Sequence, residues 1–148
     1  MPKNNLKFVD GKCLIYEDLG VRKVFVNTVL FPMGFYVLLL LRYGSELLIG
    51  LPYYSFSAMN CYFILGRFVH KMSLHKDGKS VSVSTAVDLK EKVFQITDIV
   101  DFPMAEYFKS VGTVKKFEKL PFVFSKNLEN QHADVVAEVL LGNEINTE

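Results

Sequence analysis

Two long stretches without a charged residue constrain this chain more than any other feature of its sequence. The first covers residues 24–41 and the second covers residues 47–66, which makes 18 and 20 successive uncharged residues. An α-helix rises about 1.5 Å per residue, and about 17 to 25 apolar residues cross the roughly 30 Å hydrocarbon core of a bilayer. Both stretches therefore predict membrane-spanning helices.

The alternative is that both stretches are core helices of a soluble all-α domain. The end of the first stretch, residues 37–41, is apolar on all sides, whereas a surface helix would show a polar face there. The rest of the chain offers too few apolar helical stripes to bury two such helices. We therefore favour a transmembrane helical hairpin over residues 24–69.

Charge and cysteine content exclude some classes of protein. The net charge is +1, which argues against a nucleic-acid binder driven by bulk electrostatics. The two cysteines, Cys13 and Cys61, are far apart in the sequence, so they imply no disulfide framework and cannot form a structural zinc site alone. Cys61 lies inside the second apolar stretch, where a small buried residue is expected.

Basic residues flank the predicted hairpin on one side of the membrane. Arg22 and Lys23 precede the first stretch, while Arg67 and Lys71 follow the second. The loop charges between the two spans cancel. The positive-inside rule therefore places both termini on the same side of the membrane. This is the matrix side of the mitochondrial inner membrane or, alternatively, the cytoplasmic side of another organelle's membrane. The four basic residues are expected at the lipid interface.

The second stretch is the more polar of the two. Ser57 and Cys61 are four residues apart and share a helix face, and Asn60 is the strongly polar side chain deep in the span. Asn60 can be read as a ligand or proton-path residue, or as the donor of an interhelical hydrogen bond, which we favour. Ser57, Asn60 and Cys61 are therefore the predicted helix-packing and partner-contact residues.

The remaining sequence predicts a small β-rich domain. Residues 12–16 have strand character, and Asp77-Gly78 is a strong hairpin signal. After it, Val81 and Val83 alternate with serines, which is typical of a strand with one buried face. Another strand is expected over residues 92–97, and residues 104–111 are expected to form a short helix.

The C-terminal part has a different composition. Pro121 blocks a continuous helix, so the residues after it are expected to be extended. Residues 134–141 predict a short amphipathic helix that docks on a partner, and the acidic tail beyond Gly142 is expected to be mobile unless a partner holds it. The predicted fold class is membrane α+β, divided into a segment with a short strand, the hairpin, a β-rich domain and an acidic tail over residues 1–23, 24–69, 70–126 and 127–148.

No pattern in the sequence predicts an enzyme. His70 and His75 differ by five positions, so in a strand they would face opposite sides, which is poor geometry for a shared metal even with Cys13 nearby. Phosphate-binding glycine loops, zinc-protease and nucleophile-elbow motifs do not occur. We therefore predict no catalytic, cofactor-binding or metal-binding residue.

The order of these parts resembles a known family. A short strand (KCLIY), a two-span hairpin with basic flanks and a D-G hairpin ending at Thr85 (HKDGKSVSVST) resemble the two-helix assembly-factor family of the mitochondrial inner membrane. Members of that family help to build respiratory complexes or the ATP synthase. The resemblance covers about residues 12–125 and brings no catalytic residues. It does not explain the acidic tail.

Together these observations predict a non-catalytic accessory subunit of a mitochondrial inner-membrane respiratory or ATP-synthase complex, with both termini in the matrix. Its expected partners are membrane lipids and other subunits of a hetero-oligomeric complex, and not nucleic acid. Two alternatives remain open, namely an assembly factor for such a complex and an oligomeric channel or transporter protomer. A membrane enzyme that uses His70, His75 and Cys13 is a further hypothesis.

Overall fold

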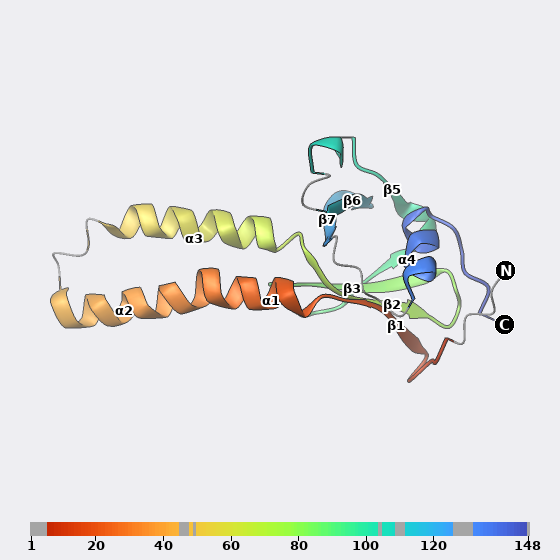
Figure 1. Ribbon diagram of the computed structural model, residues 1–148, viewed down its shortest axis with the longest axis horizontal. Helices are drawn as coiled ribbons and strands as arrows, with labels where there is room; N and C mark the ends of the chain where they lie inside the picture. The colour runs from red at the N-terminus through yellow and green to blue at the C-terminus, as the bar shows by residue number, and fades with distance from the viewer. Residues whose placement is uncertain are drawn as a thin grey trace.

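The structure, a computed structural model, consists of a helical hairpin that projects from an α+β domain (Figure 1). It describes residues 6–44, 48, 50–103, 105–108, 112–125 and 132–147. The domain lies at one end of the molecule together with both chain termini, and the two long helices extend from it to the other end.

The first arm of the hairpin is one continuous helical segment. It begins with α1 (Leu19–Phe25), passes through the π-helical turn η1 (Val26–Leu30) and continues as α2 (Phe31–Tyr43). Gly44 ends it with a positive φ of 68°, and its N–H donates to the Leu40 carbonyl. At 25 residues, this segment is long and apolar enough to cross a membrane.

The second arm, α3 (Leu51–Leu65), is shorter than the sequence predicts. It has 15 residues, about 22 Å at the α-helical rise, and among the described residues only the first arm has the length of a membrane span. Pro52 lies in its first turn and Gly66 ends it. Of the two predicted spans, one therefore forms a helix with the length and apolarity of a membrane span among the described residues.

A four-stranded antiparallel sheet brings together segments from both sides of the hairpin. Its order is β1 (Lys12–Glu17), β2 (Val69–His75), β3 (Ser80–Thr85) and β4 (Lys92–Gln95). The predicted strand at residues 12–16, the hairpin turn at Asp77-Gly78 and the strand near residue 92 are confirmed. Local sequence signals do not show that β1 pairs with β2 across the inserted helices.

The alternating strand β3 is buried on both faces. Val81 and Val83 point into the core as predicted, but Ser80, Ser82 and Ser84 are each at most 5% exposed. These serines occupy an interior strand, so side chains of the neighbouring strands cover them. The prediction of a buried valine face is therefore confirmed, and the prediction of an exposed serine face is wrong.

A second, three-stranded antiparallel sheet follows. Its order is β5 (Ile99–Asp101), β6 (Gly112–Phe117) and β7 (Leu120–Ser125), and it confirms the extended segment after Pro121. In place of the predicted helix over residues 104–111, the structure has the short 3-10 helix η4 (Ala105–Phe108), while residues 104 and 109–111 lie outside the described residues. A further 3-10 turn, η3 (Ile96–Asp98), links the two sheets.

The core between the sheets is rich in aromatic rings. Phe117 packs edge to face against Phe94 and Phe122, with ring centroids 5.4 and 5.2 Å apart. Tyr16 of the first sheet meets Phe124 of the second at 5.4 Å in the same geometry. Such contacts bury large apolar area and favour a fixed arrangement of the two sheets.

The predicted C-terminal helix is present as α4 (Ala133–Leu140), but it packs on the chain's own core. Its four large apolar side chains, Val135, Val136, Val139 and Leu140, are all buried there, and Ile145 of the tail packs against the same cluster. The sequence predicts that this helix docks on a partner, whereas the structure packs it on its own chain. Apolar periodicity indicates that one face of a helix is buried, but it does not indicate which surface covers that face. Residues 132–147 therefore complete the domain, and residues 126–131 lie outside the described residues.

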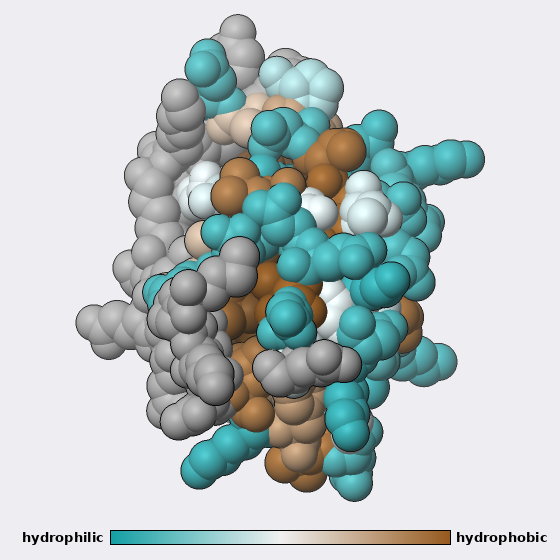
Figure 2. Space-filling view, turned by 90° about the vertical axis from the view of Figure 1, so that its right-hand side faces the viewer, coloured by the Kyte–Doolittle hydropathy of each residue, from teal (hydrophilic) through white to brown (hydrophobic). Residues whose placement is uncertain are grey.

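The two ends of the molecule differ in surface character. Seen from the end opposite the hairpin tip, polar side chains cover much of the domain, with apolar side chains visible between them (Figure 2). Along the hairpin, by contrast, large apolar side chains are exposed on both arms, among them Phe31, Leu38, Leu41, Phe56 and Phe63.

Candidate functional site

Asp18 and His70 join the base of the hairpin to the four-stranded sheet. The backbone N–H of Asp18 donates to the carbonyl of His70 (2.8 Å), and Nδ1 of the His70 ring lies 2.8 Å from the carbonyl oxygen of Asp18. Asp18 immediately precedes α1 and His70 belongs to β2. The two ends of the inserted helices are therefore held side by side.

Asp18 also starts the first helix. Its Oδ1 accepts hydrogen bonds from the backbone N–H groups of Gly20 (2.8 Å) and Val21 (3.2 Å). An aspartate in this position satisfies N–H groups that lack a partner inside the helix. The direction of the first arm away from the sheet is thereby set at its first turn.

Every fourth residue at the start of the first arm faces inward. Val21, Phe25 and Val29 are buried, while the residues between them are exposed. In a regular α-helix a spacing of four drifts around the axis, and the wider π-helical turn over Val26–Leu30 corrects this drift. The turn ends where the N–H of Phe31 donates to the Val26 carbonyl, directly before Pro32, which has no N–H to donate.

These inward residues form a small apolar cluster of their own at the base of the hairpin. It is separate from the main core and contains Val21, Phe25, Val29 and Ala86, with Cys61, Leu65, Phe68 and Val87 packed against it. The rings of Phe25 and Tyr62 are 6.4 Å apart. The two arms therefore meet each other, and the domain, at this level.

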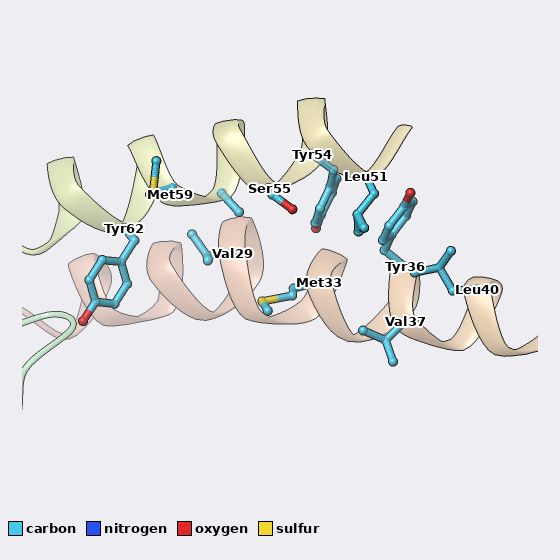
Figure 3. Close-up of a pocket in the computed structure, with 11 residues that line it drawn as sticks. Val29, Met33, Tyr36, Val37, Leu40, Leu51, Tyr54, Ser55, Met59 and Tyr62 are labelled. Atoms are coloured by element: carbon cyan, nitrogen blue, oxygen red, sulfur yellow. The ribbon is translucent and has the colours of Figure 1, made fainter. Parts of the chain in front are cut away.

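Farther from the domain, the two arms leave a groove of about 300 Å³ between them (Figure 3). Near its outer end the rings of Tyr36 and Tyr54 stack, with centroids 4.8 Å apart. Its walls consist of apolar side chains with three tyrosines and one serine, contributed by Val29, Met33, Tyr36, Val37, Leu40, Leu51, Tyr54, Ser55, Ala58, Met59 and Tyr62. Among the described residues no acid, lysine, arginine or histidine lines it, so its chemistry suits apolar contact.

The predicted packing residues of the second arm are divided between two faces. Cys61 is half-buried and packs against the cluster at the hairpin base. Ser57 and Asn60 are exposed and do not line the interhelical groove, and the Asn60 amide donates to the Phe56 carbonyl of its own helix (3.0 Å). Within the chain, the arms contact each other instead through the face that carries Ser55 and Ala58.

The basic residues predicted at the membrane interface all lie near the hairpin base. Arg22 and Lys23 are exposed on the first turns of α1, and Arg67 follows the end of α3. Lys71 belongs to β2 and forms an ion pair with Glu17 at 2.9 Å. Lys71 is therefore partly neutralised, whereas no ion pair of Arg22, Lys23 or Arg67 occurs among the described residues.

The histidines and Cys13 lie in separate environments. Cys13 points into the main core, and burial raises the pKa of its thiol even though a backbone hydrogen bond near Lys7 opposes the shift. His70 faces Asp18, whereas Nε2 of His75 lies 2.6 Å from the Ser82 hydroxyl. Among the described residues no group of three metal-binding side chains occurs, so the structure does not assemble the hypothetical His70–His75–Cys13 site.

A polar network covers the outer face of the four-stranded sheet. Lys12 of β1 forms an ion pair with Glu91, which precedes β4, and His75 and Ser82 lie on the strands between them. The hydrogen bond and charge of Lys12, with a further hydrogen bond from Ser82, lower the pKa of Glu91 despite partial burial. The Ser82 hydroxyl is buried at 2% exposure, so it is not positioned to react with a substrate.

Comparison with known proteins adds no relative. No model of a known protein family matches this chain, and no curated protein matches it in sequence.

The sequence reasoning missed the face through which the arms contact each other. Of the predicted residues Ser57, Asn60 and Cys61, only Cys61 packs against the cluster at the hairpin base. On the first arm that contact is made by Val21, Phe25 and Val29, which are not among the predicted residues. Their signal in the sequence is a large apolar residue at every fourth position immediately before Pro32. That spacing indicates a wider helical turn when it precedes a residue that cannot continue the hydrogen-bond ladder.

Proposed function

We propose that both arms cross a membrane as a hairpin and that the protein is a non-catalytic subunit of a membrane complex. The observation that carries this proposal is the exposure of the long apolar arm. Only 11% of its most apolar 18-residue window is buried, whereas a core helix of a soluble protein would be mostly buried. Large apolar surfaces of this kind are unfavourable in water and match lipid or apolar protein.

The dimensions of the first arm support a transmembrane position. Lys23 at its base and Arg42 at its tip are 19 residues apart. This separation corresponds to about 28 Å along a helix, close to the roughly 30 Å hydrocarbon thickness of a bilayer. The residues between them carry no charge, so the charged ends would lie at the two interfaces.

The geometry of the base supports a single location for the domain. Because Asp18 and His70 are hydrogen-bonded, the entry and exit of the hairpin lie on the same side of any membrane that it crosses. The exposed Arg22 and Lys23 favour the positive side. This is the mitochondrial matrix in the localisation that we propose, or the cytoplasm if another organelle's membrane holds the protein.

The outward polar residues of α3 support a role within an assembly. Ser57 and Asn60 are exposed on this arm, and a polar side chain that faces lipid is costly unless another helix offers a hydrogen bond. We therefore place the partner helices of a complex against the Ser57–Asn60 face.

The layout resemblance supports the choice of complex. A strand before the hairpin and a D-G hairpin after it are the features shared with the mitochondrial inner-membrane assembly-factor family. We propose a respiratory or ATP-synthase complex as the assembly, in which the protein is a stable accessory subunit or an assembly factor.

The experiment that tests the role in a complex is native gel electrophoresis of mildly solubilised membranes, with mass spectrometry of the comigrating band. Comigration with a complex of several hundred kilodaltons is expected. Asn60→Leu should weaken it, whereas Met59→Leu, a control on the groove side of the same helix, should not. Free monomer in the wild-type membranes would refute the proposal, and comigration with incomplete complexes alone would identify an assembly factor.

A second experiment tests the hairpin's position separately. Single cysteines are placed at the tip (Tyr43→Cys, an exposed position) and on the domain (Lys119→Cys) after replacement of Cys13 and Cys61 by alanine. Sealed vesicles are then treated with a membrane-impermeant maleimide. The two sites should label from opposite sides of the membrane. Labelling of both sites from the same side would show that the hairpin does not span it.

A further inference from the structure

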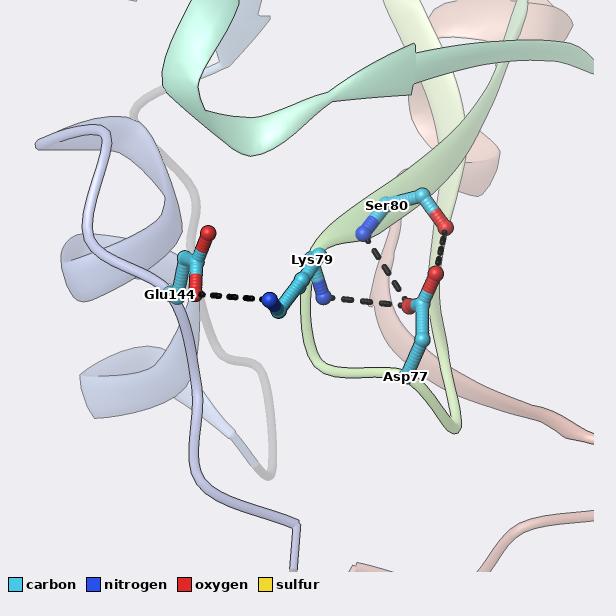
Figure 4. A network of polar contacts seen from close by, with 4 residues as sticks. All are labelled: Asp77, Lys79, Ser80 and Glu144. Carbon is cyan, nitrogen blue, oxygen red and sulfur yellow. Dashed lines mark hydrogen bonds and ion pairs between the residues drawn. The ribbon is translucent and has the colours of Figure 1, made fainter.

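The residues after α4, which we call the strap (residues 143–147), run alongside the turn between β2 and β3. The N–H of Ile145 donates to the Gly78 carbonyl (2.9 Å), and the Thr147 hydroxyl donates to the Lys76 carbonyl (2.7 Å). An ion pair of 3.8 Å joins Lys79 to Glu144, beside the turn that Asp77 caps (Figure 4). The strap is thus fastened to backbone on both sides of this turn.

The turn itself has a shape that only glycine allows at its centre. Gly78 has a φ of +66°, and a Cβ atom at this position would lie 1.9 Å from the carbonyl oxygen of Ile145. Any larger residue would therefore displace the strap, because a contact below 3.0 Å with backbone cannot be accommodated without movement. The strap and the turn are fitted to each other at this point.

The other end of the strap is joined firmly to α4. Gly142 turns the chain with a φ of +82°. The N–H of Asn143 then donates to the Glu138 carbonyl (3.1 Å), and its amide donates to the Glu138 carboxylate (2.7 Å). The position of the strap and the position of α4 are therefore coupled.

Helix α4 connects the two sheets at the end of the domain away from the hairpin. It contacts β1 of the four-stranded sheet and β5 of the three-stranded sheet. Closer to the hairpin, the sheets are joined independently by the Phe68–Val123 bridge and by the hydrogen bond from the Ser125 N–H to the Tyr16 hydroxyl. Loss of α4 would therefore remove one of the connections between the sheets, while these contacts and the packing of Phe94 on Phe117 and Phe122 remain.

We propose that the strap is a latch that keeps α4 docked across the two sheets, and that latch and helix open together while the four-stranded sheet stays folded. The latch is held by a few hydrogen bonds, one exposed ion pair and the packing of Ile145 against the core. The polar contacts contribute about 1 kcal/mol or less each. Segments that few contacts hold in place are the ones that unfold locally. Opening uncovers the apolar face of α4 and the seam between the sheets.

This device does not depend on the membrane proposal, because every residue in it belongs to the α+β domain. Its test is hydrogen exchange followed by mass spectrometry on the full chain in detergent micelles. Gly78→Ala is compared with Gly11→Ala, a matched control that also has a positive φ (+76°) but has no atom within 4 Å of the added Cβ. Backbone strain is common to both variants, whereas displacement of the strap is specific to Gly78→Ala.

We expect the amides of α4 to exchange at least about tenfold faster in Gly78→Ala than in Gly11→Ala, with the protection of β3 the same in both. Thr147→Val leaves the turn glycine intact and removes one strap hydrogen bond, so it should speed exchange of α4 about fivefold, which corresponds to about 1 kcal/mol. Equal exchange of α4 in the two glycine variants would overturn the proposal. Loss of β3 protection in step with α4 in Thr147→Val would also overturn it, because α4 would then open only with the whole domain.

Discussion

Asp18 and His70 are hydrogen-bonded to each other through the backbone although 52 residues separate them in the chain. Everything between them is the helical hairpin and its connections. The strand before the hairpin and the strand after it are neighbours in one sheet, so the sheet is complete only when the hairpin has returned to its starting point. Folding of the domain and placement of the hairpin are therefore coupled through this contact.

Replacement of the capping aspartate should weaken that connection. Asp18→Ala removes the acceptor for the N–H groups of Gly20 and Val21 and should lower the free energy of unfolding by about 1 kcal/mol. Asp18→Asn keeps an acceptor oxygen and should retain most of the stability. Thermal unfolding in micelles, followed by circular dichroism, measures the difference. Equal losses in both variants would mean that the carboxylate charge, and not the cap, stabilises the helix start.

The sequence predicts local elements well where a local signal exists. The Asp77-Gly78 turn has a positive φ at Gly78, which glycine adopts readily, and it joins two paired strands as expected. The amphipathic stripe of α4 is likewise visible in the sequence. These features depend on neighbours within a few residues, so a pattern of residues is sufficient to reveal them.

The features that the sequence does not predict depend on contacts between residues that are distant in the chain. Nothing close to Lys12 in the sequence shows that its strand pairs with His75, or that Glu91 lies across the sheet from it. The apolar side of α4 indicates burial but not the surface that buries it. In the candidate site, the inward face of the first arm depends on a π-helical turn, which shifts the positions that regular helical periodicity would select.

The apolar cluster at the hairpin base should contribute more to stability than exposed aromatic residues on the same arm. Phe25 is 8% exposed and Phe31 is 72% exposed. Phe25→Ala should lower the free energy of unfolding by about 3–5 kcal/mol, the range for a buried phenylalanine, and Phe31→Ala by less than about 1 kcal/mol. Chemical unfolding in micelles provides the comparison. Similar losses in the two variants would contradict the packing described for the base.

Acid should destabilise the domain partly through Asp77. Burial raises the pKa of this carboxyl, but hydrogen bonds from the Ser80 hydroxyl and from the backbone N–H groups of Lys79 and Ser80 outweigh it, so the pKa falls below its ordinary 3.8. A lowered folded-state pKa gives stability that is present above about pH 4 and lost as the pH falls through the folded-state value.

Melting temperatures between pH 6 and pH 3 test this assignment. Asp77→Asn should melt at a lower temperature than the wild type at pH 6, and the difference should shrink towards pH 3. Asp10→Asn, on another turn of the same domain, serves as the control. A difference between wild type and Asp77→Asn that stays constant over this range would show that the Asp77 charge does not contribute.

Alkaline pH should act through Tyr16. Burial raises the pKa of the Tyr16 hydroxyl to about 12, with a smaller lowering from the Ser125 backbone and a smaller raising from the charge of Asp18. An unfolded tyrosine ionises near pH 10, so between about pH 10 and 12 the unfolded state has lost a proton that the folded state keeps. Stability that is present below pH 10 is therefore lost as the pH rises through this window.

Tyr16→Phe removes both the hydroxyl and its proton. At pH 8 this variant should be less stable by about 1 kcal/mol, because the hydrogen bond from the Ser125 N–H to the hydroxyl is lost. Above pH 10 its stability should fall less steeply than that of the wild type, so the two curves should converge. Denaturant titrations at intervals from pH 8 to 11.5 measure both effects. Parallel curves over the whole range would mean that Tyr16 keeps an ordinary pKa and that its hydroxyl is not buried between the two sheets.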